Sequence, residues 1–121
     1  MKPQVLLAAF IAVTATAAPV ALQPKDIAGD WVSLQQCSQS LRKFTFDGRY
    51  RGYCFDMLEG GRWALRSGDK LVITHYDDLS KETISPKSET ETITIIGWEP
   101  HSDRTFMYVR LANGTRDKWM K

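Results

Sequence analysis

The sequence has few of the residues on which catalytic sites usually depend. Of its 121 residues, only two are histidine and two are cysteine. It contains no G-x-S-x-G motif, no H-E-x-x-H motif and no glycine-rich phosphate loop, which mark hydrolases, zinc proteases and nucleotide sites. Asp56 and Glu59 could form a carboxylate pair, but they flank a predicted turn, where carboxylates are common. We therefore expect a protein that is not an enzyme and that needs no cofactor.

The two histidines lie near carboxylates, so a metal site has to be considered. His75 comes just before two aspartates at 77–78, and His101 comes just before Asp103. Histidine together with carboxylates suits several divalent ions. However, His75 alternates in phase with the apolar residues of the segment 70–76, which favours an inward-pointing, hydrogen-bonded core histidine. We therefore predict no metal site.

Long hydrophobic runs are also absent. The apolar run at 5–13 is far shorter than the roughly 20 residues that a membrane-spanning helix needs. Lys2 precedes this run, and the small residues Ala15 and Ala17 follow it, which is typical of a secretory signal peptide. We expect a periplasmic or secreted protein with no stable membrane anchor. The predicted organisation is a signal peptide (1–17), a flexible leader (18–26) and one domain (27–121).

The two cysteines are predicted to form a disulfide. An exported protein passes through an oxidising compartment, where an even pair is most simply one bridge. In the predicted hairpin, Cys54 folds back opposite residues near Leu41, a few positions from Cys37. Closing this loop would contribute about 3 kcal/mol in the chain-entropy model. The alternative, a reactive thiol or metal ligand, has neither a C-x-x-C motif nor a nearby histidine to support it.

Charge of one sign does not dominate. The formal net charge of +2 is too balanced for a dedicated nucleic-acid-binding protein, so we expect no nucleic-acid partner. The charged residues are distributed unevenly along the sequence. This pattern indicates either ordinary solvated faces or a bipolar surface that steers a charged partner. The basic residues gather in the first half of the domain: Arg42, Lys43, Arg49, Arg51, Arg62 and Arg66. The acidic residues gather in the second half: Asp77, Asp78, Glu82, Glu89, Glu91, Glu99 and Asp103.

Convincing helical periodicity is missing after the signal peptide, and the pattern is that of strands. Phe44 and Phe46 alternate with polar residues, which predicts a strand with one buried face. Asp47-Gly48 predicts a two-residue hairpin turn, because this pair tolerates positive φ. We expect Gly60-Gly61 to turn the chain again. The segment 42–65 therefore reads as three antiparallel strands.

The remaining chain continues this meander. Further strands are predicted at 31–34, 70–76, 89–98, 104–111 and 115–121, with a strong type I′ turn signal at Asn113-Gly114. The irregular connection 77–88 is long for a hairpin; such loops are usually functional or mobile, although a flap without a role is equally compatible. Eight short, hairpin-linked strands predict an all-β, eight-stranded antiparallel up-and-down barrel, whose closure removes exposed edges.

The chain resembles the small bacterial lipocalin-like (calycin) β-barrel domains. The matching residues are Gly29-Asp30-Trp31, F-x-x-D-G-x-Y at 44–50 and G-x-W-x-L at 61–65. The resemblance implies that Trp31 packs across a closed barrel end, beneath a basic residue from the last strands, Arg116 or Lys118. Typical lipocalins are longer and end with a helix packed on the barrel, and neither feature is evident here.

Binding is the function class that this resemblance favours. A small apolar ligand would lie inside the barrel, although eight strands leave an interior that side chains can also fill. The predicted ligand-binding residues are Trp31, Phe44, Phe46, Trp63, Leu71, Ile73, Trp98 and Trp119. The alternative is a periplasmic inhibitor or immunity protein that binds a cell-wall-active enzyme or a toxin through its rim loops. Its predicted partner-binding residues lie in an acidic flap: Asp77, Asp78, Glu82, Glu89 and Glu91. A platform for cell-wall sugars on strands 49–66 is a third possibility, and we expect a monomer in each case.

Overall fold

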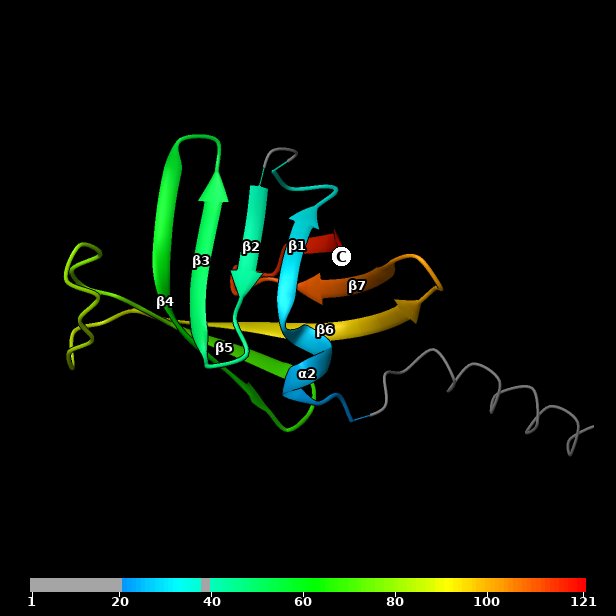
Figure 1. Ribbon diagram of the computed structural model, residues 1–121, viewed down its shortest axis with the longest axis horizontal. Coiled ribbons are helices and arrows are strands. Elements are labelled where there is room, and N and C mark those ends of the chain that lie inside the picture. Colours follow the sequence, from blue (N-terminus) through cyan, green and yellow to red (C-terminus); the bar gives the residue numbers. More distant parts are fainter. Residues whose placement is uncertain (1–20, 38–39) are drawn as a thin grey trace, which may run out of the picture.

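The protein folds as a closed eight-stranded barrel, as predicted (Figure 1). The computed structural model describes residues 21–37 and 40–121, so the predicted signal peptide lies outside the described residues. Every strand pairs antiparallel with its neighbour in the chain, and the last strand pairs with the first. The strands are β1 (Gly29–Ser33), β2 (Ser40–Phe44), β3 (Arg49–Cys54), β4 (Met57–Arg66), β5 (Lys70–His75), β6 (Thr90–Pro100), β7 (Thr105–Arg110) and β8 (Arg116–Met120).

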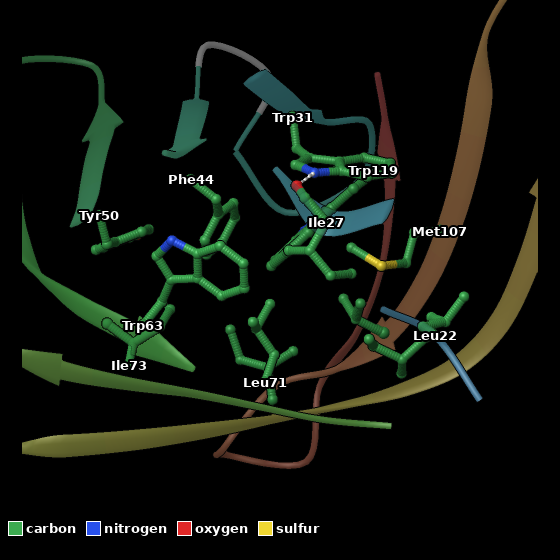
Figure 2. Packing of buried hydrophobic residues seen from close by; sticks show 13 residues of the cluster. Leu22, Ile27, Trp31, Phe44, Tyr50, Trp63, Leu71, Ile73, Met107 and Trp119 are labelled. Carbon is green, nitrogen blue, oxygen red and sulfur yellow. Dashed lines mark hydrogen bonds between the residues drawn. The ribbon is translucent and has the colours of Figure 1, made fainter. Parts of the chain in front are cut away.

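The up-and-down order gives the barrel two different ends. The β1–β2, β3–β4, β5–β6 and β7–β8 connections lie at one end, which we call the mouth. The other three connections lie at the opposite, closed end. There the short helix α2 (Pro24–Ile27) precedes β1 (Figure 1). Leu22 and Ile27 are buried in the core (Figure 2). Part of the segment predicted as a flexible leader, 18–26, thus packs against the barrel. Among the described residues, no helix has the length and apolar character to cross a membrane.

Aromatic side chains fill the closed half of the barrel (Figure 2). Phe44 lies between Trp63 and Trp119, with ring centroids 5.5 and 6.2 Å away. The Trp31 indole donates a hydrogen bond of 2.7 Å to the Ile27 carbonyl, which ties β1 to α2 (Figure 2). Such edge-to-face and stacked ring pairs add to the stabilisation from apolar burial. The closed half is therefore a packed core.

The basic residue on Trp31 is Lys121, and the prediction of Arg116 or Lys118 was wrong. The Lys121 ammonium lies 4.8 Å from the centre of the Trp31 ring and donates to the Asp26 and Ala28 carbonyls. Lys118 instead lies over Phe106, at 4.4 Å, because its side chain alternates to the outside of the barrel. The tryptophan at the closed end is thus covered by the last residue of the chain.

Phe46 is not in the interior, and this prediction was wrong. β2 ends at Phe44, and Phe46, Asp47 and Gly48 form a three-residue loop closed by the Thr45 N–H to Arg49 carbonyl hydrogen bond. Gly48 has φ of +91°, as expected for a loop in which a type I turn is followed by a left-handed residue. Phe46 consequently sits at the loop tip and is 73% exposed.

The predicted turn at Gly60-Gly61 was also wrong, because both glycines lie inside β4. The chain turns instead at Phe55 and Asp56, since Cys54 already pairs with Met57. A Cβ on Gly61 would collide with the Thr74 carbonyl oxygen, so glycine is required for the close approach of β4 and β5. In this chain, the glycine pair marks close strand packing.

A β-bulge in β6 changes which of its side chains face inward. The register shifts between Ile95 and Gly97, so that Ile95 pairs with Val109 and Trp98 pairs with Met107. Paired residues share a face, and Val109 and Met107 are both fully buried. Ile95 and Trp98 therefore both point inward although they are three residues apart.

Candidate functional site

The inner face of the barrel changes from apolar to polar toward the mouth. In the register, Arg42 lies opposite Gly52, which in turn lies opposite Glu59 on β4. Gly61 lies opposite His75, and Ile73 lies opposite Glu91. Paired residues point to the same side of a sheet. The inner faces of five consecutive strands, β2 to β6, therefore carry a continuous set of polar side chains. We call this set the mouth cluster: Arg42, Tyr50, Glu59, His75 and Glu91.

The mouth cluster is connected by hydrogen bonds and ion pairs. Arg42 Nη1 donates to the Tyr50 hydroxyl at 3.2 Å, and the Tyr50 hydroxyl donates to Glu59 Oε1. His75 Nε2 lies 3.2 Å from Glu91 Oε1, which lies 4.0 Å from Arg42 Nη1. The side chains of Arg42, His75 and Glu91 are each about a fifth exposed. The inward, hydrogen-bonded position predicted for His75 is confirmed.

Burial fixes the protonation state of Tyr50. Desolvation raises the pKa of its hydroxyl far above the usual value, and the neighbouring carboxylates Glu59 and Glu91 act in the same direction. The Arg42 guanidinium opposes this shift but does not overcome it. Tyr50 therefore stays protonated over the physiological range and acts as a permanent donor toward Glu59.

Gly52 makes room for this arrangement. A Cβ at this position would overlap the Tyr50 hydroxyl and lie 2.7 Å from Glu59 Cγ. Any other residue would push these two side chains apart. Glycine in the middle of β3 is thus explained by the side chains that cross over it inside the barrel.

A pocket of about 160 Å³ opens beside the mouth cluster. Its lining combines polar and charged side chains, among them Arg42, Tyr50 and Glu59, with apolar ones such as Met57 and Leu111. The residues that line it are Ser33, Gln36, Cys37, Ser40, Arg42, Tyr50, Tyr53, Cys54, Met57, Leu58, Glu59, Leu111 and Asp117. The pocket is smaller than the roughly 300 Å³ at which sites for drug-sized molecules begin. It can therefore take a small amphipathic molecule.

The predicted disulfide is confirmed and forms part of the pocket wall. Cys37 and Cys54 are joined, with their Cα atoms 6.2 Å apart. The bridge links the connection after β1 to the end of β3. It therefore holds two sides of the pocket at a fixed separation.

Asp117 anchors the same wall from β8. This buried carboxylate accepts hydrogen bonds from the Ser33 hydroxyl at 2.6 Å and from the Trp119 indole at 2.9 Å. It also accepts from the backbone N–H groups of Gln35 and Lys118. The Ser33 hydroxyl in turn accepts from the Cys37 N–H at 3.3 Å. A continuous chain of bonds thus runs from β8 to the disulfide.

The β3–β4 hairpin forms an apolar rim above the pocket. Phe55 at its turn is 65% exposed and Met57 is 73% exposed, and Tyr53 and Leu58 beside them are also exposed. Tyr53 pairs with Leu58 on the outer face of the hairpin. These exposed apolar side chains lie together next to the pocket.

The predicted interior residues occupy the core below this pocket. Six of them are buried, Trp98 is partly buried against the core, and Phe46 is outside. The buried ones are Trp31, Phe44, Trp63, Leu71, Ile73 and Trp119. None of the eight is among the residues that line the mouth pocket. Their role as ligand contacts stays a prediction, and their observed contacts are with one another.

The acidic flap does not present its carboxylates as one patch. Asp78 accepts from the Ser80 hydroxyl at 2.7 Å, which lowers the Asp78 pKa, and Asp77 accepts from the Thr83 hydroxyl at 2.8 Å. Glu82 forms an ion pair with Arg51 at 2.5 Å. Glu89 is exposed, whereas Glu91 turns into the mouth cluster. A partner-binding role for the flap stays a prediction.

Sequence reasoning missed Arg42, Tyr50 and Glu59 as a group. A usable signal was present, because Arg42 alternates in phase with Phe44, and the residue paired with Phe44 is Tyr50. A charged residue in the inward phase of a barrel strand marks a polar interior. Glu59 was hidden by the incorrect turn at Gly60-Gly61, which would have placed it in a loop.

No protein family, no curated protein and no solved structure matched this chain. The site must therefore be interpreted from its own geometry.

Proposed function

We propose that this protein is an exported, non-enzymatic binding protein with a lipocalin-like barrel, and that it holds a small, largely apolar molecule in the mouth pocket. The observation that carries the proposal is the mixed polar and apolar lining of that pocket. Arg42, Tyr50 and Glu59 offer hydrogen bonds to a polar end, while Met57 and Leu111 offer apolar contacts. Polar groups that fix orientation, placed beside apolar side chains, are typical of ligand pockets.

The packed core supports the mouth as the ligand position. The closed half of the barrel is occupied by buried aromatic and aliphatic side chains, so a ligand there would have to displace them. The disulfide and the hydrogen bonds of Asp117 fix the position of the wall of the mouth pocket. A rigid wall lowers the ordering cost of binding.

The disulfide also supports export. Bridges persist in oxidising compartments such as the periplasm or the extracellular space. A lipocalin-like relationship and a bacterial origin are part of this proposal, and the closed eight-stranded antiparallel barrel is compatible with both. We expect a monomer that binds neither nucleic acid nor a membrane stably.

An NMR titration tests the proposal. Short-chain probes with one polar end, such as hexanamide and 1-hexanol, are added to the ¹⁵N-labelled domain, with glycerol as a polar control. We expect shifts confined to residues around the pocket. Arg42→Met should weaken binding, whereas Arg62→Met, an exposed arginine on the outside of β4, should leave it unchanged. Shifts spread over the barrel surface, or equal binding by both variants, would contradict the proposal.

The apolar rim favours one second candidate, an inhibitor or immunity protein that binds a cell-wall-active enzyme or a toxin. Phe55 and Met57 project from the hairpin turn, where a partner could cover them. The test is a binding assay with lysozyme-type enzymes, in which a Phe55→Ser, Met57→Ser double variant should lose binding. If this variant binds as tightly as the wild type, the rim does not contact the partner.

A further inference from the structure

Three potential metal ligands converge in the mouth cluster from three consecutive strands. Glu59 on β4, His75 on β5 and Glu91 on β6 each offer one ligand atom, and these atoms lie within 4.8 Å of one another. In the sequence, the carboxylates nearest to His75 are those of Asp77 and Asp78. In the structure the partners of His75 come from the adjacent strands.

The barrel register creates this convergence. His75 lies opposite Gly61, which has no side chain, so Glu59 two residues earlier on β4 is its neighbour on the inner face. Glu91 lies opposite Ile73, two residues before His75, and already approaches Nε2 of His75 to 3.2 Å. Because strand alternation fixes all three side chains to the inner face, their proximity is a property of the fold.

The donor set selects a class of ion. One imidazole nitrogen and two carboxylate oxygens suit first-row transition ions and Zn²⁺, while Ca²⁺ and Mg²⁺ prefer oxygen alone. We propose that Glu59, His75 and Glu91 bind a divalent transition-metal cation, for which Zn²⁺ is the probe. This proposal goes beyond the binding of an amphipathic molecule and does not depend on it.

Neighbouring groups act on two of these ligands, and they act in opposite ways. The Tyr50 hydroxyl donates to Glu59 Oε1 and thereby fixes the direction of that carboxylate. Hydrogen bonds of this kind orient liganding groups at metal centres. Arg42, with Nη1 4.0 Å from Glu91, has the opposite effect, because its charge competes with a cation for the same carboxylate.

Calorimetric titration of the chelator-treated protein with Zn²⁺ tests the proposal. We expect one ion per chain, and weaker or no binding of Ca²⁺ and Mg²⁺. His75→Ala should lower the Zn²⁺ affinity by about tenfold or more, as should the near-isosteric Glu91→Gln. Arg42→Met should raise it, by roughly tenfold, since it removes a competing positive charge. No loss of affinity in His75→Ala would overturn the proposal.

The chain offers a matched control. His101 Nε2 also bonds a carboxylate, that of Glu99, at 2.7 Å on the surface. His101→Ala should therefore bind Zn²⁺ like the wild type, and a loss of binding in this variant would place the ion on the surface instead.

Crystals of the wild type grown with Zn²⁺ test the site without any substitution. Anomalous scattering should place the ion between Glu59, His75 and Glu91. An ion found elsewhere, or none, would refute the site even if a variant failed to fold. The hexanamide titration of the proposed ligand pocket is read out separately, so either proposal can fail alone.

Discussion

Replacing Asp117 with alanine should destabilise the barrel strongly, because this carboxylate joins β8 to β1 and to the disulfide loop. Four donors point at its two oxygens. Two of them, the Ser33 hydroxyl and the Trp119 indole N–H, belong to buried side chains. Water cannot readily replace the carboxylate at these two groups.

The expected loss of stability follows from these two donors, which Asp117→Ala leaves without an acceptor. A buried polar group left without a partner costs about 1–3 kcal/mol, which gives about 2–6 kcal/mol for the two together. The backbone donors of Gln35 and Lys118 lie nearer to solvent and add less. For a domain of about 100 residues, the melting temperature should fall by roughly 8 °C or more.

The assay is thermal and urea unfolding of the oxidised protein, followed by circular dichroism. Asp117→Asn is the matched variant, because both buried donors bond Oδ2, and an amide oxygen at that position can accept both protons. Its amide nitrogen then faces the backbone N–H groups of Gln35 and Lys118, so we expect it to cost less than Asp117→Ala but more than nothing. If Asp117→Ala costs less than about 1 kcal/mol, the hydrogen-bond account of this wall is refuted.

Three further predictions concern the disulfide, the corrected β2–β3 loop and the flap. Replacing Cys37 and Cys54 with serine should remove about 3 kcal/mol of stability, measured by urea unfolding against the oxidised wild type; an unchanged midpoint would contradict a closed bridge. Phe44→Ala should cost about 3–5 kcal/mol, whereas Phe46→Ala should cost less than about 0.5 kcal/mol, in the same assay. Equal losses of stability in the two variants would indicate that Phe46 is buried in the core. The pKa of Asp78 is lowered from 3.8, chiefly by the Ser80 hydroxyl. The carboxylate therefore stabilises the flap at pH values above its pKa in the unfolded chain. This contribution is lost as the pH falls through the pKa of Asp78 in the folded protein. An NMR titration should show an Asp78 midpoint below 3.8 that rises in Ser80→Ala. An unchanged midpoint in this variant would show that the Ser80 hydroxyl does not lower the pKa.

The barrel could be predicted from the sequence because strand alternation and turn residues are local signals. Closure into eight antiparallel strands and the Cys37–Cys54 bridge followed from hairpin order and export. Errors arose where tertiary contacts override local chemistry. Gly60-Gly61 has the composition of a turn, but Thr74 and Leu79 approach these glycines so closely that a strand without side chains is needed.

The candidate site was harder to predict, because it depends on register. A bulge at Ile95/Gly97 and a loop one residue longer than expected at Asp47-Gly48 cannot be read from alternation alone. Once the register is known, Arg42, Glu59 and Glu91 fall on one inner surface although they are far apart in sequence. Glu91 was therefore assigned to an outer flap, while the structure places it in the mouth.

The most direct test of the account is native mass spectrometry of the protein purified from the oxidising compartment of an expressing cell. We expect a monomer that retains a small molecule, and we expect Arg42→Met to lose this adduct while Arg62→Met keeps it. An adduct that survives Arg42→Met, or one that is lost only when core residues such as Leu71 are changed, would contradict binding in the mouth pocket.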